Sequence, residues 1–138
     1  MFKNQVNQFT IVKNKLLMPQ EIEIHYLIPS INRIISKKLS ALNVSKKDIA
    51  RLLQAQNSTI SQYIHDKRGK KIEFENKIID YIESRAQIIL ENNNYLQEVQ
   101  NILSKFRKDK ILCKYHRELS PIINQTCVEG KLGCDLNG

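Results

Sequence analysis

The sequence predicts an all-α fold in which two short helices joined by a tight turn are followed by two amphipathic helices and an irregular Cys-containing tail. Apolar residues recur at spacings of three and four through most of positions 30–110. Two short periodic stretches, separated by a brief break, lie within positions 46–65. The 138 residues, 41% of them hydrophobic, suffice for one core with short appendages.

The positive charge of the chain is concentrated in one stretch. From Ser30 to Lys71 there are ten bases and two acids; ten minus two equals the net charge of +8 of the whole chain. A local field of this kind favours a polyanion as partner, nucleic acid first and an anionic membrane surface second. A basic face that only keeps the protein soluble is the alternative.

No apolar run approaches the roughly 18 residues of a transmembrane helix, so the chain is not expected to span a membrane. With nucleic acid the favoured polyanion, we expect DNA and no membrane as partner. The N-terminus lacks the apolar segment of a signal peptide, and we expect a cytoplasmic location.

The N-terminal third predicts one strong helix. Residues 1–18 are rich in Asn, Gln and Lys and predict a flexible arm. Residues 20–28 predict a short strand or the first turn of a helix, and Pro29 is expected to end it and to suit the start of the next element. From Ser30 a single apolar stripe predicts a helix that carries Ile31, Ile34, Ile35, Leu39 and Leu42.

The two short helices follow. Ser45 predicts an N-cap, with Asp48 three residues later as in a capping box. The first helix, 46–54, would bury Ile49, Leu52 and Leu53, and Ala50 is small enough to let a second helix cross closely. After a break at 54–56, the second helix, 57–65, would bury Ile60 and Ile64. Gly69 is expected to end this unit.

Two amphipathic helices are predicted after Gly69. One runs from Phe74 to about Glu91, the Asn92–Asn94 triplet marks a turn, and the next runs from Leu96 to about residue 110. We therefore expect residues 19–71 to form a DNA-binding domain, 72–112 a helical dimerisation region and 113–138 a Cys/His tail.

Two short helices with a tight turn behind a longer helix match the helix-turn-helix pattern, in which the second helix enters the major groove. Amides and hydroxyls at the start of that helix suit base edges, because they donate and accept hydrogen bonds. Flanking bases would hold phosphates without reading sequence. The expected DNA-binding residues are Lys46, Lys47, Gln56, Asn57, Ser58, Thr59, Ser61, Gln62, Lys67, Arg68 and Lys70, with Lys37 and Lys38 as weaker candidates.

These motifs resemble a family of small prokaryotic, notably archaeal, helix-turn-helix transcriptional regulators. The resemblance covers about residues 17–118. It rests on Pro19–Gln20–Glu21, Ile28–Pro29, Ser45 through Leu53, and above all the segment from Ile60 to Ile64 with Lys67–Arg68–Gly69. It implies a dimeric transcriptional regulator.

More distantly, the helix pair is similar to phage-repressor domains, which implies base contacts by Asn57, Ser58 and Gln62. Gln54 stands where such turns usually have Gly, so Gln54 must adopt the backbone that the turn demands, a left-handed one included, at some cost.

The tail carries a candidate metal site. Cys113, His116, Cys127 and Cys134 are a complete set of tetrahedral zinc ligands, and the same thiolates could hold an iron–sulfur cluster. Such a site would make the regulator responsive to metal or redox state. Relatives in the resembling family also carry a Leu-Cys-x-x-His motif here. The alternative is a small buried Cys113 with free thiols beyond it.

An antitoxin-like or partner-binding protein could use the same helices for autoregulation, with 72–91 and 96–110 as its partner surface. An enzyme is not expected, because the sequence has no Gly-rich phosphate loop, no Ser–His–Asp arrangement and no paired acids that could flank a cleft.

Overall fold

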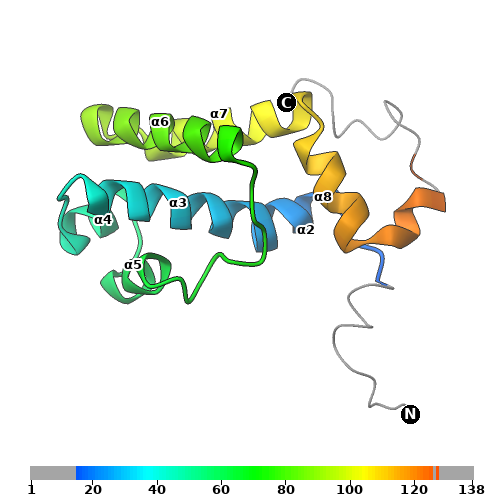
Figure 1. The fold of residues 1–138 in the computed structure, drawn as a ribbon, viewed down its shortest axis with the longest axis horizontal. Helices are drawn as coiled ribbons and strands as arrows, with labels where there is room; N and C mark the ends of the chain where they lie inside the picture. Colours follow the sequence, from blue (N-terminus) through cyan, green and yellow to red (C-terminus); the bar gives the residue numbers. More distant parts are fainter. Residues whose placement is uncertain (1–14, 126, 128–138) are drawn as a thin grey trace, which may run out of the picture. The chain divides into compact units, whose positions relative to one another are not determined.

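The structure, a computed structural model, describes residues 15–125 and 127 of the chain (Figure 1). No strand occurs among these residues, which confirms the all-α prediction. The elements are α2 (Pro19–Ile22), the π-helical turn η1 (Glu23–Leu27), α3 (Ile28–Ala41), α4 (Lys46–Leu53), α5 (Asn57–Ile64), α6 (Asn76–Asn92), α7 (Tyr95–Lys108), α8 (Ile111–Leu119) and the 3₁₀ turn η2 (Pro121–Gln125). No described helix has the length and apolar character needed to cross a bilayer.

The described residues fall into two compact units. One comprises residues 24–102, and the other comprises residues 15–23 with 103–125 and 127. The units follow packing and cut across the four functional segments expected from the sequence, so that division stays a prediction.

The strand alternative for residues 20–28 is wrong, because α2 and η1 occupy this segment. The prediction that Pro29 ends the preceding element is also wrong. Pro29 is the second residue of α3, where its missing N–H leaves no intrahelical bond unmade. The same property makes proline suitable near a helix start, which is the part of the prediction that holds.

Helix α3 forms the centre of the larger unit. It contacts α4, α5 and α6, and in Figure 1 it lies between α6 and α5. The predicted stripe faces inward, with Ile31, Ile35 and Leu39 fully buried. Leu42 departs from the prediction and is 38% exposed, because the helix ends at Ala41 and Leu42 is its C-cap.

A polar network joins three helices of this unit. The Tyr95 hydroxyl on α7 donates to Asn32 Oδ1 on α3 at 2.7 Å, and Asn32 Nδ2 donates to the Tyr63 hydroxyl on α5 at 3.5 Å. Burial raises the pKa of Tyr95 above its ordinary value, so the phenol stays a donor at neutral pH. The network ties the orientation of α5 to the helical support behind it.

A buried ion pair links α6 and α7. Glu98 is 3% exposed, accepts from Arg85 Nε, and also accepts from Asn94 Nδ2 at 3.3 Å. The hydrogen bond from Arg85 to Glu98 raises the pKa of Arg85. This partner explains why a charged residue occupies the apolar face of α6.

The smaller unit is built around α8, which packs on α2. Leu112 and Tyr115 of α8 are buried, as are Ile22 and Phe106. The prediction of an irregular tail from residue 113 is therefore wrong over 113–119, which belong to α8. The apolar residues Leu112 and Tyr115 do have helical spacing, but the pattern is short. Residues 1–14, 126 and 128–138 lie outside the described residues.

The last residues of the predicted arm are held in place. Ser120 Oγ accepts from Leu17 N at 3.0 Å and donates to Lys15 O at 2.6 Å. Leu17 itself is 7% exposed. The expectation of a flexible arm is therefore wrong for residues 15–17.

Arg85→Ala should lower the free energy of unfolding by about 2 kcal/mol, because Glu98 would stay buried without its charged partner. Urea denaturation measures this change. Lys77→Ala, an exposed change on the same helix, should stay within about 0.5 kcal/mol of wild type. The double variant Arg85→Met/Glu98→Leu should recover most of the loss. Equal effects of Arg85→Ala and Lys77→Ala would contradict a structural role for the pair.

Candidate nucleic-acid interface

The start of α4 is fixed as the sequence predicts. Ser45 Oγ accepts from Asp48 N at 3.1 Å, which satisfies one of the free N–H groups of the first turn. The Asp48 carboxylate pairs with Arg51 at 3.1 Å. The two lysines of this turn, Lys46 and Lys47, are exposed.

The turn between α4 and α5 has the expected geometry. Gln54 adopts a left-handed conformation with φ 54° and ψ 45°, and Ala55 N donates to Ala50 O at 2.9 Å. Ala50 is 5% exposed, consistent with the close approach of α4 and α5. A residue other than Gly costs some conformational free energy in this left-handed backbone. The packing around the turn outweighs that cost at Gln54.

The inner face of α5 differs from the prediction at one position. Ile60 is fully buried with Ile49 and Leu53, as expected, but Ile64 is only half-buried. Tyr63 is buried in addition, at 6% exposure, and joins the network with Asn32. Tyr63 is thus a packing residue of the helix pair.

The outer face of α5 is polar and open to solvent. Gln56, Asn57, Ser58 and Gln62 are exposed, and Thr59 and Ser61 are half-buried at its edges. Five of the six predicted base-contacting side chains therefore lie on or beside the solvent-facing side of α5, and the sixth, Gln56, is its N-cap.

Cations lie at both edges of this face. Lys46 Nζ of α4 lies 3.4 Å from Ser61 Oγ, and Arg68 Nη1 of the following loop lies 3.5 Å from Thr59 Oγ1. These long, exposed contacts contribute little stability. They show that two predicted phosphate-binding residues, distant in sequence, flank the same polar face.

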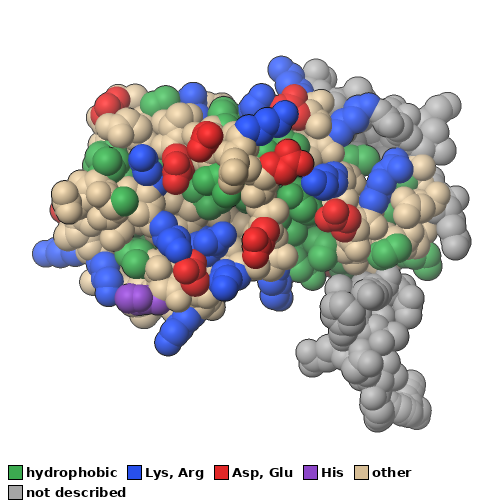
Figure 2. Space-filling model, in the orientation of Figure 1, with side chains coloured by type: hydrophobic (Ala, Val, Ile, Leu, Met, Phe, Trp, Pro, Cys, Tyr) green, Lys and Arg blue, Asp and Glu red, His purple; other side chains and the backbone are tan. Residues whose placement is uncertain are grey.

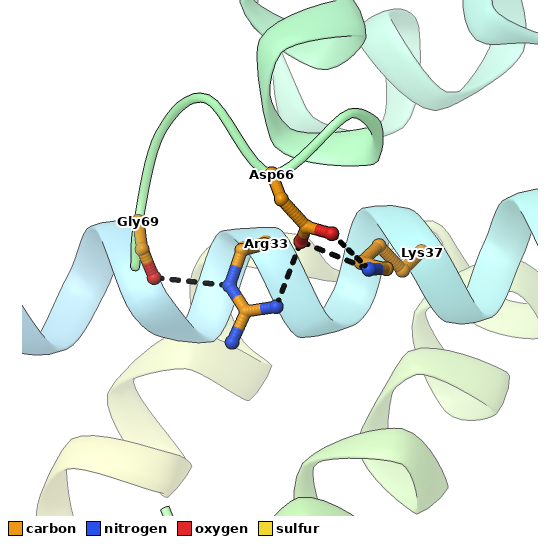
Figure 3. Close-up of polar contacts among 4 residues, drawn as sticks. All are labelled: Arg33, Lys37, Asp66 and Gly69. Atoms are coloured by element: carbon orange, nitrogen blue, oxygen red, sulfur yellow. Dashed lines mark hydrogen bonds and ion pairs between the residues drawn. The ribbon is translucent and has the colours of Figure 1, made fainter. Parts of the chain in front are cut away.

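The loop after α5 is fastened to α3 by an ion cluster that the sequence analysis missed (Figure 3). Asp66 accepts from Arg33 Nη1 at 3.0 Å and from Lys37 Nζ at 2.8 and 2.9 Å. Arg33 Nε also donates to Gly69 O at 3.0 Å. The only sequence signal is that Asp66 is one of two acids among ten bases. Lys37, a weaker DNA candidate, is engaged in this internal pair.

Gly69 fits against α3 so closely that only glycine can occupy the position. Its φ is +78°, and a Cβ there would lie 2.3 Å from the carbonyl oxygen of Pro29. Gly69 was expected to end the two-helix unit; it lies beyond α5, which ends at Ile64, and serves the docking of the following loop on α3.

The fixed loop presents further charge. Lys67, Arg68 and Lys70 are exposed. Figure 2 shows Lys and Arg side chains gathered over the part of the larger unit between α3 and α5, with few acidic ones among them. The geometry thus combines a neutral hydrogen-bonding helix face with a positive border.

The predicted metal ligands are placed only in part. Cys113 and His116 lie on α8, and His116 is buried with its Nε2 bonded to the Leu17 carbonyl. Arg117 donates to Cys127 Sγ at 3.9 Å, and hydrogen bonding with Cys113 raises the pKa of Arg117. No group of three or more potential ligands is assembled among the described residues, and Cys134 lies outside them. The zinc or iron–sulfur site stays a prediction.

Asp66→Asn tests the ion cluster by its pH dependence. The hydrogen bond from Lys37, reinforced by Arg33, lowers the pKa of Asp66 below its ordinary value. A lowered folded-state pKa contributes stability that is complete above the unfolded value of about 3.9 and disappears as pH falls through the folded value. Thermal unfolding at pH 7 down to pH 2.5 should show the variant less stable at pH 7. The two curves should converge in acid, and a difference that stays constant with pH would exclude this origin.

Comparisons with protein-family models, with curated proteins and with solved structures give no match to this chain.

Proposed function

We propose that this protein is a sequence-specific DNA-binding transcriptional regulator that uses α4, the turn at Gln54 and α5 as a helix-turn-helix. In this proposal α5 enters the major groove. The family resemblance of the sequence agrees with the proposal, and the single observation that carries it is the bordered face of α5: base-matching polar groups in the centre and Lys46 and Arg68 at opposite edges.

The chemistry of the face suits DNA better than a protein partner. Amide groups such as those of Asn57 and Gln62 donate and accept together, as the adenine edge requires. The described outer face of α5 has no large exposed hydrophobic residue of the kind that forms the core of many protein–protein interfaces. The bases around it would release counterions from phosphates and give a salt-dependent affinity.

The proposal includes a homodimer, since one such unit covers only part of a helical turn of DNA. A symmetric pair would gain affinity and select a palindromic site. The metal- or redox-dependent control expected from the tail remains part of the proposal as an input to the dimer.

A second candidate is a partner-binding, antitoxin-like protein. It is favoured by Leu96, which is 72% exposed at the start of α7. Leu96 borders a cavity of about 490 Å³ that also includes Gln54, and Asn94 Oδ1, which lines it, is buried without a hydrogen-bond partner among the described residues. A partner seated there would touch the turn between α4 and α5.

The residue roles are tested on DNA sequences enriched from a random duplex pool. Gln62→Ala should reduce the preference for the enriched sequence by about 1–3 kcal/mol and leave the salt dependence unchanged. Arg68→Ala should weaken all duplexes alike and reduce the salt slope by about one unit. Fluorescence anisotropy at several salt concentrations measures both. Lys77→Ala is the matched control for loss of a surface charge. If neither variant differs from wild type, the assignment of α5 fails.

The mass of the isolated protein separates the two candidates. Sedimentation equilibrium should give a stable homodimer for the regulator. Leu96→Glu should shift that dimer toward monomer if α7 forms the interface. A monomeric wild type that binds DNA only with a second protein present would favour the antitoxin-like function.

A further inference from the structure

A second feature of the larger unit is a cavity between the start of α3 and the loop 66–71. Its volume is about 480 Å³, within the ~300–1,000 Å³ typical of small-molecule sites. One wall is basic and consists of Lys67, Arg68, Lys70 and Lys71. The other wall, from residues 24–30, carries the apolar side chains of Ile24, Tyr26 and Pro29 together with His25 and Ser30.

The charge of the basic wall is not neutralised internally. Among the described residues none of these four side chains forms an ion pair. The one acid in the lining, Asp66, is already paired with Arg33 and Lys37. Lys71 Nζ lies 5.5 Å from the centre of the Tyr26 ring, which places a cation beside an aromatic face. The cavity therefore presents a net positive field to any ligand.

Ser30 gives a second, independent indication of a ligand. It lines the cavity, is fully buried, and its Oγ has no hydrogen-bond partner among the described residues. A buried hydroxyl without a partner is unfavourable, and an acceptor oxygen brought within hydrogen-bond distance of Ser30 Oγ would satisfy it.

The loop that forms the basic wall is held in one position. Asp66 anchors its start to α3 (Figure 3). Gly69 rests against Pro29 with no room for a side chain. The cations are thus carried on a backbone attached to α3 at two points, an arrangement that lowers the entropic cost of ordering them around a ligand.

We propose that this cavity binds a small organic phosphate, a phosphate attached to a flat or apolar group. The phosphate would lie against the basic wall and accept from Ser30. The organic group would cover Ile24 and the ring of Tyr26, where Ile24 is 60% exposed. The volume exceeds what a phosphate ion alone occupies, and the apolar wall gives a phosphate ion nothing to bind.

Binding at this place would oppose DNA binding. Arg68 lines the cavity and also borders α5 through Thr59, and Lys67 and Lys70 belong to both sets of residues. A ligand phosphate would neutralise cations that the proposed function assigns to DNA phosphates. The ligand would thus act as an effector of the proposed regulator. The same phosphate chemistry could alternatively come from the DNA backbone, and the experiment has an arm for each source.

Isothermal titration at constant ionic strength, on the full chain, tests the soluble source. The probes are phenyl phosphate and adenosine 5′-monophosphate, each against its unphosphorylated counterpart and inorganic phosphate. The organic phosphates should bind more tightly than both controls. Lys71→Gln should weaken them about tenfold, and Tyr26→Leu should remove their advantage over inorganic phosphate. Lys77→Ala should change nothing.

Ser30→Ala separates a ligand role from a structural one. Because the hydroxyl has no partner, the substitution should leave the thermal midpoint unchanged or higher, yet reduce phosphate affinity. A lowered midpoint with unchanged affinity would overturn the role given to Ser30.

The second arm measures duplex binding by the same variants. If no soluble phosphate binds but Lys71→Gln and Ser30→Ala both weaken duplex binding, the cavity takes a backbone phosphate, and the effector role is wrong. If neither arm responds to these variants, the phosphate site is overturned. If the wild-type chain binds organic phosphates but no duplex, the cavity is an organic-phosphate site as proposed. That result would contradict only the proposed DNA-binding function.

Discussion

The ion cluster of Asp66 with Arg33 and Lys37 determines how the larger unit presents its functional groups. It fixes the loop after α5 to the central helix, with 2.8–3.0 Å between the charged atoms. Gly69 completes the attachment because its backbone touches Pro29 directly. Without this attachment Arg68 would not be held at the edge of α5, and the cavity beside α3 would lose its basic wall.

The cluster also separates the basic residues into two groups, those that pair with Asp66 and those that stay exposed. Arg33 and Lys37 are consumed in holding Asp66, whereas Lys67, Arg68 and Lys70 remain exposed. Partly buried charges need partners, and exposed ones are free to meet a ligand. The net charge of residues 30–71 therefore overstates how many basic side chains are available to a polyanion. The position of each cation matters more than the total charge.

Local signals made much of the larger unit predictable. Ser45 is a cap, Gln54 is left-handed, and Ile49, Leu53 and Ile60 are buried, because capping, turn geometry and apolar spacing act over a few residues. The errors have longer-range causes. The error at Pro29 arises because a proline breaks a helix in its interior but is tolerated in the first turn. Which of the two applies depends on where α3 begins, and the residues around Pro29 do not reveal that. Residues 113–119 are helical because α8 packs on α2, which lies some 90 residues earlier in the sequence. Asp66 and Tyr63 acquire their roles from partners on other helices, which no local pattern contains.

The candidate interface also has features that local sequence determines and features that depend on long-range packing. Its polar residues could be named from the sequence because one helix carries them at fixed spacing. Their placement relative to Lys46 and Arg68 required the structure, since it depends on the crossing of α4 and α5 and on the attached loop. The cavity has no sequence signature, because η1, the start of α3 and the loop 66–71 build it jointly.

The most direct test of the central claim is to map the proposed DNA-binding surface residue by residue. Backbone amide NMR shifts of the labelled protein would be followed during titration with a mixed-sequence duplex at low salt. The account predicts that the largest changes fall on the start of α4, on α5 from Asn57 to Gln62 and on the loop around Arg68. Changes concentrated on the exposed residues of α6 and α7, or no changes at all, would contradict it.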